Sequence, residues 1–202
     1  MSPYENTYSA FMLDHASGAL PRAEQLVADL HMALSPKGHR IGLIAASMGG
    51  ALLEAADPAE ISGGTAEPRR APAAPPERSM VADYLDCDLM ALKWRKSIFG
   101  VKTVKTAMPM VELLRLDPGE VAPGHNHGRR DVTVVLTGSY ADEYGVYTRG
   151  DLAFAEPGMR HTPRAVGDET CVCLIATESG RPLLGLFGLF GIGVRKLKDQ
   201  SS

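Results

Sequence analysis

Residues 57–80 lack any hydrophobic period and divide the 202-residue chain into two unequal parts. The run SGGTAEPRRAPAAPPERS within this stretch is rich in Pro, Gly and Ala, a composition typical of flexible or partly extended linkers. A chain of this length suits one large or two small domains. We therefore expect a first domain at residues 1–56, a linker at 57–80 and a second domain at 81–202.

The first part has the apolar spacing of short helices. Apolar residues recur at a helical period from Tyr8 onward, and Gly18 can end this first helix. A second helix is expected after Pro21, and Ser35-Pro36 is typical of the N-cap and first-turn proline of a third. The core-facing positions of the third helix are expected at Ile41, Ile44, Ala45, Met48 and Leu52. Three such helices make a small bundle that needs a partner or a second copy to be stable.

The second part changes to short apolar runs separated by glycine and proline. The clearest runs cover residues 110–116, 132–137, 151–155 and 171–176. Several short strands at close spacing with turn signals between them are typical of a β-sandwich or barrel. The whole chain is therefore expected to be α+β, with about three helices followed by an all-β domain.

Three histidines and an aspartate suggest a metal site in the β-rich part. His125, His127 and Asp131 are separated by even numbers of residues, so in an extended strand they share one face. With His161 from elsewhere, two or three imidazoles and a carboxylate suit a divalent transition metal. The alternative is a pair of histidines on a surface loop beside an aspartate in a turn. The flanking glycines argue against this alternative.

The glycines around these residues bring a family resemblance. The pattern Gly119-x5-His125-x-His127-x3-Asp131-x6-Gly138 resembles the first motif of the cupin superfamily, with Asp131 where the family usually carries Glu. Downstream, Pro157-Gly158-x-x-His161 resembles the second motif. The resemblance implies a double-stranded β-helix, or jelly-roll barrel. It also implies a metal site with His125, His127, Asp131 and His161 as ligands. Zinc is the expected metal, with iron, manganese and nickel as alternatives.

A closer resemblance covers nearly the whole chain. The segments VADYL near Val81, LKWR from Leu92, VVLTGSYADE from Val134, HTP from His161 and CVCL from Cys171 are similar to anti-sigma factors of the ChrR type. The resemblance implies a helical domain that binds an extracytoplasmic-function sigma factor in the cytoplasm. It also implies a zinc-carrying cupin domain that is needed to release the sigma factor under oxidative stress. The chain would then be a transcription regulator.

The helical part departs from that family at its own zinc site. The family binds a second zinc there through one His followed by a His-x3-Cys-x2-Cys cluster. This chain carries Asn6, His31, Ser35 and Gly38 at those positions. Serine and glycine do not replace thiolates, so we expect no second zinc in this half. A dimerisation module is the alternative role for the helices.

Composition excludes some functions. A net charge of −3 gives no basic face for direct nucleic-acid binding. The apolar tract at 182–194 is too short and too rich in glycine to span a bilayer, so no membrane role is expected; it should pack on the barrel or at a dimer contact. The start MSPYENTYSA lacks the features of a secretory signal. An odd number of cysteines, three, fits a reducing cytoplasm. We expect a cytoplasmic homodimer.

A cupin site can serve a switch or an enzyme. Three histidines and a carboxylate also occur in metal-dependent cupin dioxygenases, which need an open metal position and acid–base groups. The expected barrel lining supplies little strong base: Thr133, Val135, Thr137, Cys171 and Cys173. This favours sensing over catalysis, with the dioxygenase as the alternative and a binding protein without either activity as a third reading. The two cysteines are interpreted as barrel-lining residues or as oxidant-sensitive thiols. As neighbours on one strand face they are poorly placed for a disulfide.

Overall fold

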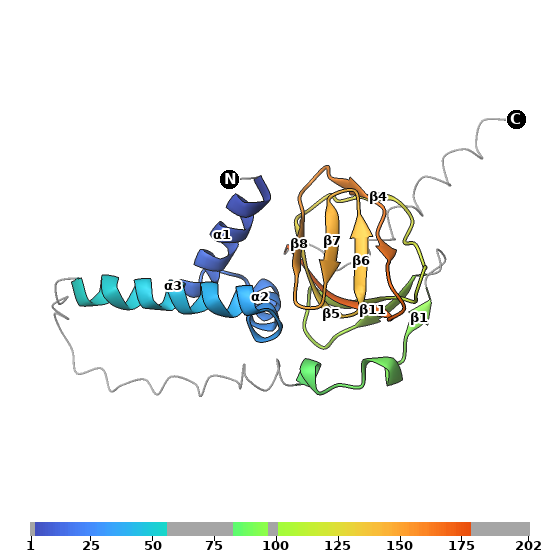
Figure 1. The fold of residues 1–202 in the computed structure, drawn as a ribbon, viewed down its shortest axis with the longest axis horizontal. Helices are drawn as coiled ribbons and strands as arrows, with labels where there is room; N and C mark the ends of the chain where they lie inside the picture. Colours follow the sequence, from blue (N-terminus) through green and yellow to red (C-terminus); the bar gives the residue numbers. More distant parts are fainter. Residues whose placement is uncertain (1–2, 56–82, 97–100, 179–202) are drawn as a thin grey trace, which may run out of the picture.

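A computed structural model describes residues 3–55, 83–96 and 101–178. The expected linker at 57–80 and the apolar tract at 182–194 lie outside these described residues, so both expectations remain predictions. Within the described part, three helices precede an antiparallel β-barrel, which confirms the expected α+β fold. Figure 1 shows the helices gathered beside one side of the barrel. No helix in the described residues is long and apolar enough to cross a membrane.

The three helices begin and end where local chemistry predicts. They are α1 (Pro3–Ala16), α2 (Arg22–Leu34) and α3 (Pro36–Ala55). Gly18 adopts a left-handed φ of 72°, and the N–H of Ala19 donates to the carbonyl of Asp14 at 2.8 Å. This 6→1 bond is the Schellman arrangement that ends a helix. Pro21 and Pro36, which lack an N–H, then stand at the starts of the next two helices.

The expected core face of α3 is only partly correct. Ala45 is buried and Ile41 partly buried, but Ile44 and Met48 are 49% and 56% exposed. The side chain of Leu52 lies outside what the structure describes. Figure 1 shows that α3 is longer than its neighbours and projects beyond them, so α1 and α2 cover only its first part. The rest of the apolar face has no neighbour among the residues that the structure describes.

The barrel is built from three sheets with every strand pair antiparallel. The largest has the order β1-β2-β3-β11-β5-β8, the second is β10-β6-β7, and β4 pairs with β9. The short 3-10 helix η1 (Leu89–Ala91) leads into the first strand. The strands are β1 (Arg95–Lys96), β2 (Lys102–Lys105), β3 (Val111–Leu116), β4 (His125–Asn126), β5 (Asp131–Thr137), β6 (Ser139–Asp142), β7 (Gly145–Thr148), β8 (Leu152–Ala155), β9 (Arg160–His161), β10 (Arg164–Ala165) and β11 (Cys171–Thr177).

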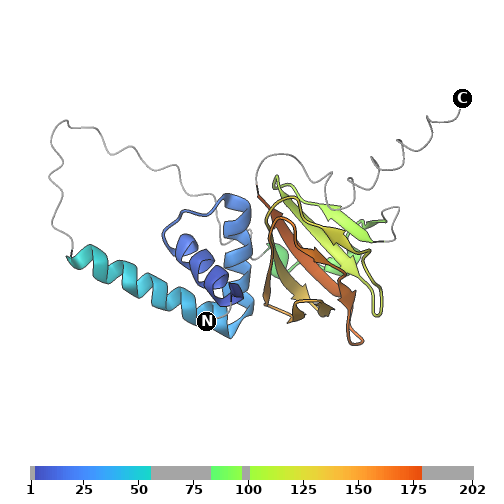
Figure 2. The same cartoon turned by 90° about the horizontal axis from the view of Figure 1, so that it is seen from above.

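Both faces of the six-stranded sheet are covered. Residues facing into the barrel, such as Val135 and Cys173, form one apolar cluster with residues of the smaller sheet. Residues on the opposite face, such as Val134 and Leu174, form a second cluster with α1 and α2. Every residue of β11 is therefore buried. This explains why its sequence is a continuous apolar run rather than an alternating one. Figure 2 shows α2 lying along the sheet.

Specific contacts join the helices to the sheet. The rings of Phe11 and Phe154 meet edge to face with centroids 5.3 Å apart. The Arg130 guanidinium lies 5.6 Å from the centre of the Phe11 ring and 3.5 Å from the carboxylate of Glu24, which is buried in α2. Burial raises the pKa of Glu24, and Arg130 opposes that rise. The two parts of the chain therefore share one apolar layer, whatever the exact domain limits, which stay a prediction.

Candidate metal centre

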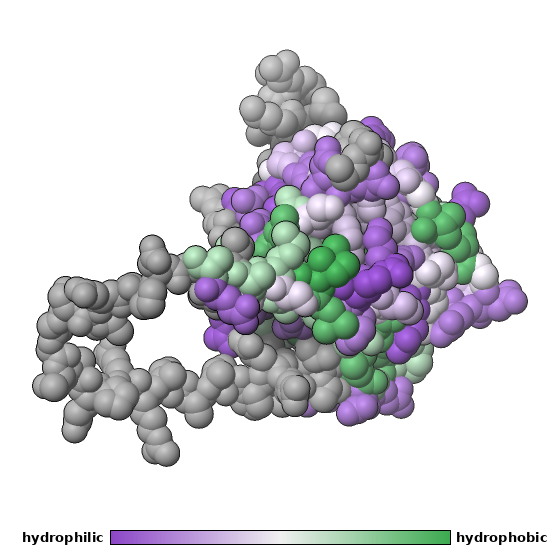
Figure 3. Space-filling model, turned by 60° about the vertical axis from the view of Figure 1, so that its left-hand side comes forward, coloured by the Kyte–Doolittle hydropathy of each residue, from purple (hydrophilic) through white to green (hydrophobic). Residues whose placement is uncertain are grey.

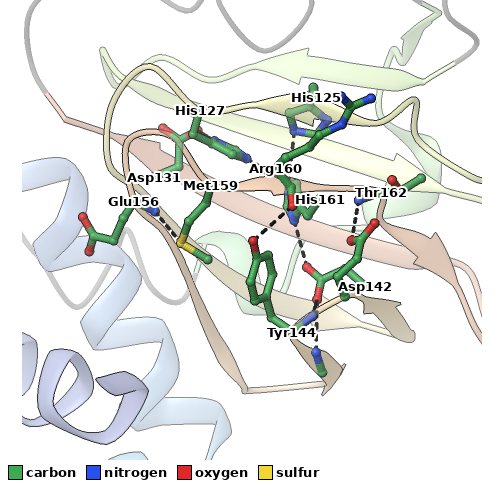
Figure 4. A network of polar contacts seen from close by, with 12 residues as sticks. His125, His127, Asp131, Asp142, Tyr144, Glu156, Met159, Arg160, His161 and Thr162 are labelled. Atoms are coloured by element: carbon green, nitrogen blue, oxygen red, sulfur yellow. Dashed lines mark hydrogen bonds and ion pairs between the residues drawn. The ribbon is translucent and has the colours of Figure 1, made fainter. Parts of the chain in front are cut away.

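The two sequence motifs meet at the pair β4–β9. In this antiparallel pair His125 lies directly opposite His161. The chain continues past β4 to His127, whose N–H donates to the carbonyl of Met159 at 3.1 Å, while the N–H of Gly158 donates back to His127 at 2.8 Å. The three imidazoles are thereby brought together at one end of the barrel, with ligand atoms all within 4.8 Å of one another. Figure 4 shows them converging.

The outer nitrogen of each ring is fixed by an oxygen. The Nδ1 atoms contact Asp131 Oδ2 at 2.8 Å (His127), Asp142 Oδ2 at 2.8 Å (His161) and the carbonyl of Pro123 at 2.9 Å (His125). Ionised carboxylates and carbonyls only accept hydrogen bonds, so each Nδ1 carries the ring proton. Such oxygen partners are typical of histidines that ligate metals, because they fix the tautomer and orient the ring.

The inner nitrogens of the three rings, the Nε2 atoms, face one another. The Nε2 of His161 lies 2.9 Å from that of His127 and 3.1 Å from that of His125. A neutral ring whose Nδ1 holds the proton offers only a lone pair at Nε2, so three such nitrogens repel each other unless a cation lies among them. Tetrahedral zinc with ligand bonds of 2.0–2.1 Å needs nitrogens roughly 3.3 Å apart. The donor set and its spacing therefore fit a divalent transition metal.

The protonation state of His125 suits a ligand. Its pKa is lowered to about 4, chiefly by burial and also by the neighbouring His161 and His127 rings, while the Pro123 carbonyl and Asp131 act in the opposite direction. A histidine must be neutral to offer a lone pair to a metal. His125 is therefore ready to bind at neutral pH.

Asp131 lies behind the histidines rather than among them. Its Oδ2 accepts from His127, and its buried Oδ1 has no hydrogen-bond partner among the described residues. Aspartate is one methylene shorter than the glutamate of the motif, so from the start of β5 its carboxylate reaches the outer nitrogen of His127. The structure thus brings three of the four expected residues together. Direct ligation by Asp131 stays a prediction, and a free Oδ1 keeps it chemically possible.

Two other carboxylates of the barrel, Glu112 and Glu143, have hydrogen-bond partners outside the three histidines. Glu143 accepts from the N–H of Thr162 at 2.8 Å, and Glu112 bonds with Thr103 on the neighbouring strand. Asp142 is the carboxylate that the sequence reasoning missed. A signal was present, because Tyr140 faces the barrel interior and residues two apart on a strand share a face. Its Oδ1 accepts from the N–H groups of Tyr144 and Gly145, which hold the carboxylate toward His161.

The barrel interior beside the cluster is small and mostly apolar. The cavity measures about 50 Å³ and is bordered by residues that include Leu114, Tyr140, Tyr147, Ile175 and, from the expected lining, Thr133 and Cys173. Sites for organic ligands usually measure roughly 300–1,000 Å³. The cavity is large enough for water or a small diatomic molecule.

The two cysteines of β11 lie close together, and the Cys173 thiol is not activated. A bulge between Val172 and Cys173 breaks the register with β5, and the sulfur atoms of Cys171 and Cys173 lie 3.7 Å apart. The Cys171 thiol and burial raise the pKa of Cys173 well above its usual value. A protonated, buried thiol is a poor nucleophile, which favours the barrel-lining role over direct oxidation.

The fold and the site define a class of protein: a cupin barrel that carries three histidines at one end and is preceded by a small helical domain packed on its sheet. A family model described as the ChrR Cupin-like domain matches residues 86–180. Over 192 residues the chain is 31% identical to the anti-sigma-E factor ChrR of Cereibacter sphaeroides, covering 84% of this chain and 87% of that protein. A crystal structure of Rhodobacter sphaeroides SigE in complex with the anti-sigma ChrR matches with a TM-score of 0.67, 29% identity, 84% of this chain and 96% of the other. The chain belongs to the ChrR family.

The oxygen partner of His161 gives the first testable prediction. Changing Asp142→Asn keeps an acceptor near Nδ1 but removes its charge, so we expect zinc affinity to fall by about 10–100-fold, the usual effect of such a partner. A competition titration with a zinc chelator measures this. Glu143→Gln is the matched control, because this neighbouring carboxylate accepts a hydrogen bond from the N–H of Thr162 and has none with the His161 ring, whose electrostatic effect is the smallest of those on the pKa of Glu143. Equal affinities of both variants would contradict the assigned role of Asp142.

Proposed function

We propose that this chain is a ChrR-like regulator that binds an extracytoplasmic-function sigma factor through its helices and carries a zinc ion in its cupin barrel. The single observation that carries the metal half is the set of three Nε2 atoms that face one another. The family membership carries the sigma-factor half, since the similar solved structure is named as a complex of SigE with ChrR. A sigma-factor partner would support a cytoplasmic location, which we include in the proposal.

An exposed apolar face on α3 supports a partner. Leu43, Ile44 and Met48 are about half exposed or more, at 57%, 49% and 56%. Figure 3 looks toward the side from which α3 projects and shows apolar side chains, in green, among hydrophilic ones. Several large apolar side chains on one projecting helix favour a protein interface. We assign the sigma factor to this surface; a second copy of the chain is the competing occupant.

The metal end of the barrel is connected to the helices by neighbouring residues. His127 bonds to Asp131, and the adjacent Arg130 reaches Glu24 and the ring of Phe11. When bound, zinc would join β4 to β9, which otherwise pair over only two residues each. We infer that oxidative damage to this site loosens the end of the barrel and moves Arg130. The movement of Arg130 would then weaken the binding of the sigma factor to the helices.

The dioxygenase alternative has less support. The cavity beside the histidines, at about 50 Å³, leaves little room for an organic substrate in this conformation. Reconstitution with iron and a measurement of oxygen consumption would separate the two functions, because the regulator is expected to consume none.

Partner binding is tested by charging the α3 face. In co-expression with an extracytoplasmic-function sigma factor, the wild-type chain is expected to copurify with it and to inhibit its transcription in vitro. Ile44→Glu should weaken the complex by at least about tenfold, since a charge would be buried in the interface. Val146→Glu, an exposed apolar position on the barrel, is the control and should leave binding unchanged. No complex with the wild type, or equal affinity for both variants, would refute this surface.

A further inference from the structure

His31 on α2 is a buried side chain that the proposed function does not use. It is 2% exposed, and its ring lies between the two parts of the chain. The Tyr8 hydroxyl from α1 lies 2.9 Å from Nε2, and the carbonyl of Gly150, at the turn between β7 and β8, lies 2.6 Å from Nδ1. One imidazole therefore connects α1, α2 and the barrel.

Two glycines allow this close approach. A Cβ added at Gly150, whose φ is 88°, would lie 2.9 Å from the carbonyl oxygen of Leu34 at the end of α2. A Cβ added at Gly38 in α3 would lie 2.6 Å from Cδ2 of the His31 ring. Real Cβ contacts are essentially never this short. Any residue with a side chain at Gly38 or Gly150 would therefore push α2, the His31 ring and the turn apart.

The same geometry makes His31 unsuited to hold a metal. The Gly150 carbonyl can only accept, so Nδ1 carries the proton and Nε2 receives the Tyr8 hydroxyl hydrogen. Both nitrogens are thus used. Of the other positions at which the family resemblance implies zinc ligands, Ser35 accepts from the N–H of Gly38 at 3.3 Å, and Gly38 has no side chain. The residues present do not fit a second zinc.

We propose that His31 is a metal-free latch that holds the joint between α2 and α3 against the β7–β8 turn of the barrel. The joint is short, because Ser35 alone separates the two helices. The latch therefore sets the direction in which α3 leaves the barrel. The consequence for a sigma factor bound to α3 rests on the proposed function; the latch itself does not.

Hydrogen exchange in the full chain tests the latch. The amides of Gly150 and Asp151 donate to the carbonyls of Val135 and Thr148 and report on the turn. Gly38→Ala puts a methyl group against the ring and the backbone carbonyl of His31, and should speed exchange at these amides by about tenfold, the equivalent of one net hydrogen bond. Gly49→Ala is the matched control on the same helix, because its Cβ meets nothing within 4 Å. Both changes favour helix in isolation.

Equal exchange at the turn in the two glycine variants would overturn the latch. A second arm uses metal content: His31→Ala should retain all the metal of the wild type, and loss of one equivalent would show that His31 is a ligand. Tyr8→Phe is a milder variant for the exchange measurement, needed if His31→Ala lowers the helix content seen by circular dichroism. That variant keeps the ring but removes one hydrogen bond, and unchanged exchange at the turn would count against the latch. None of these readouts needs a sigma factor.

Discussion

Replacing His161 by alanine is expected to abolish metal retention by the purified protein. His161 is the central member of the cluster, because its Nε2 is within 3.1 Å of both other Nε2 atoms. Its loss leaves two imidazoles on one strand segment and removes the ligand that joins β9 to them. We therefore expect an affinity loss well beyond the roughly 10–100-fold typical of an indirect partner.

Elemental analysis of the protein as purified, followed by a chelator competition, measures the effect. His39→Ala is the control, since this histidine is exposed on α3. Full metal content in the His161→Ala protein, or equal losses in the two variants, would contradict the site.

The same assay decides the role of Asp131. Asparagine at this position keeps an oxygen that accepts from His127 Nδ1 but offers a metal only a neutral ligand. If Asp131 acts through His127, Asp131→Asn should resemble Asp142→Asn. If Oδ1, which has no hydrogen-bond partner among the described residues, turns to the ion, the loss should approach that of His161→Ala.

The sequence allowed the histidines to be predicted because their positions follow from local rules. Residues that are two positions apart on a strand share a face, and glycines mark the turns that bring the two motifs together. The position of the Asp131 carboxylate could not be predicted from these local rules, because it depends on a side chain one methylene shorter than Glu and on the residue at which β5 begins. Asp142 comes from a third strand: the two-residue spacing from Tyr140 indicates which face it shares, but its approach to His161 depends on how the strands pair.

The packing of the helices on the barrel was also beyond local rules, although one signal was present. A continuous apolar run at 171–176 is unusual for an antiparallel strand with one wet face and indicates a second covering layer. Periodicity indicates which helix face is apolar but not what covers it. Periodicity therefore placed Ile44 and Met48 in the core, although both are exposed. It also gave no sign of the long-range contact between His31 and Gly150.

Phe11→Ala is expected to lower the free energy of unfolding by about 3–5 kcal/mol, the usual cost of removing a buried aromatic ring. Phe11 is fully buried, and its ring contacts both Phe154 and the Arg130 guanidinium. The cavity would lie between the helices and the sheet, where neither side can close it without moving. Leu13→Ala on the same helix is the control, since that side chain is 53% exposed and should matter by roughly 0.5 kcal/mol or less.

Two signals followed during denaturation show whether helices and barrel unfold together. Far-ultraviolet circular dichroism reports on the helices, and the single tryptophan, Trp94, packs against the apolar cluster shared with α1 and α2. If that cluster is one cooperative unit, Phe11→Ala should shift both transitions by the same amount. A shift of the helical signal alone would mean that the helices fold independently and rest on the barrel weakly. The connection from His127 through Arg130 to α1 would then be too weak to transmit a change at the metal site.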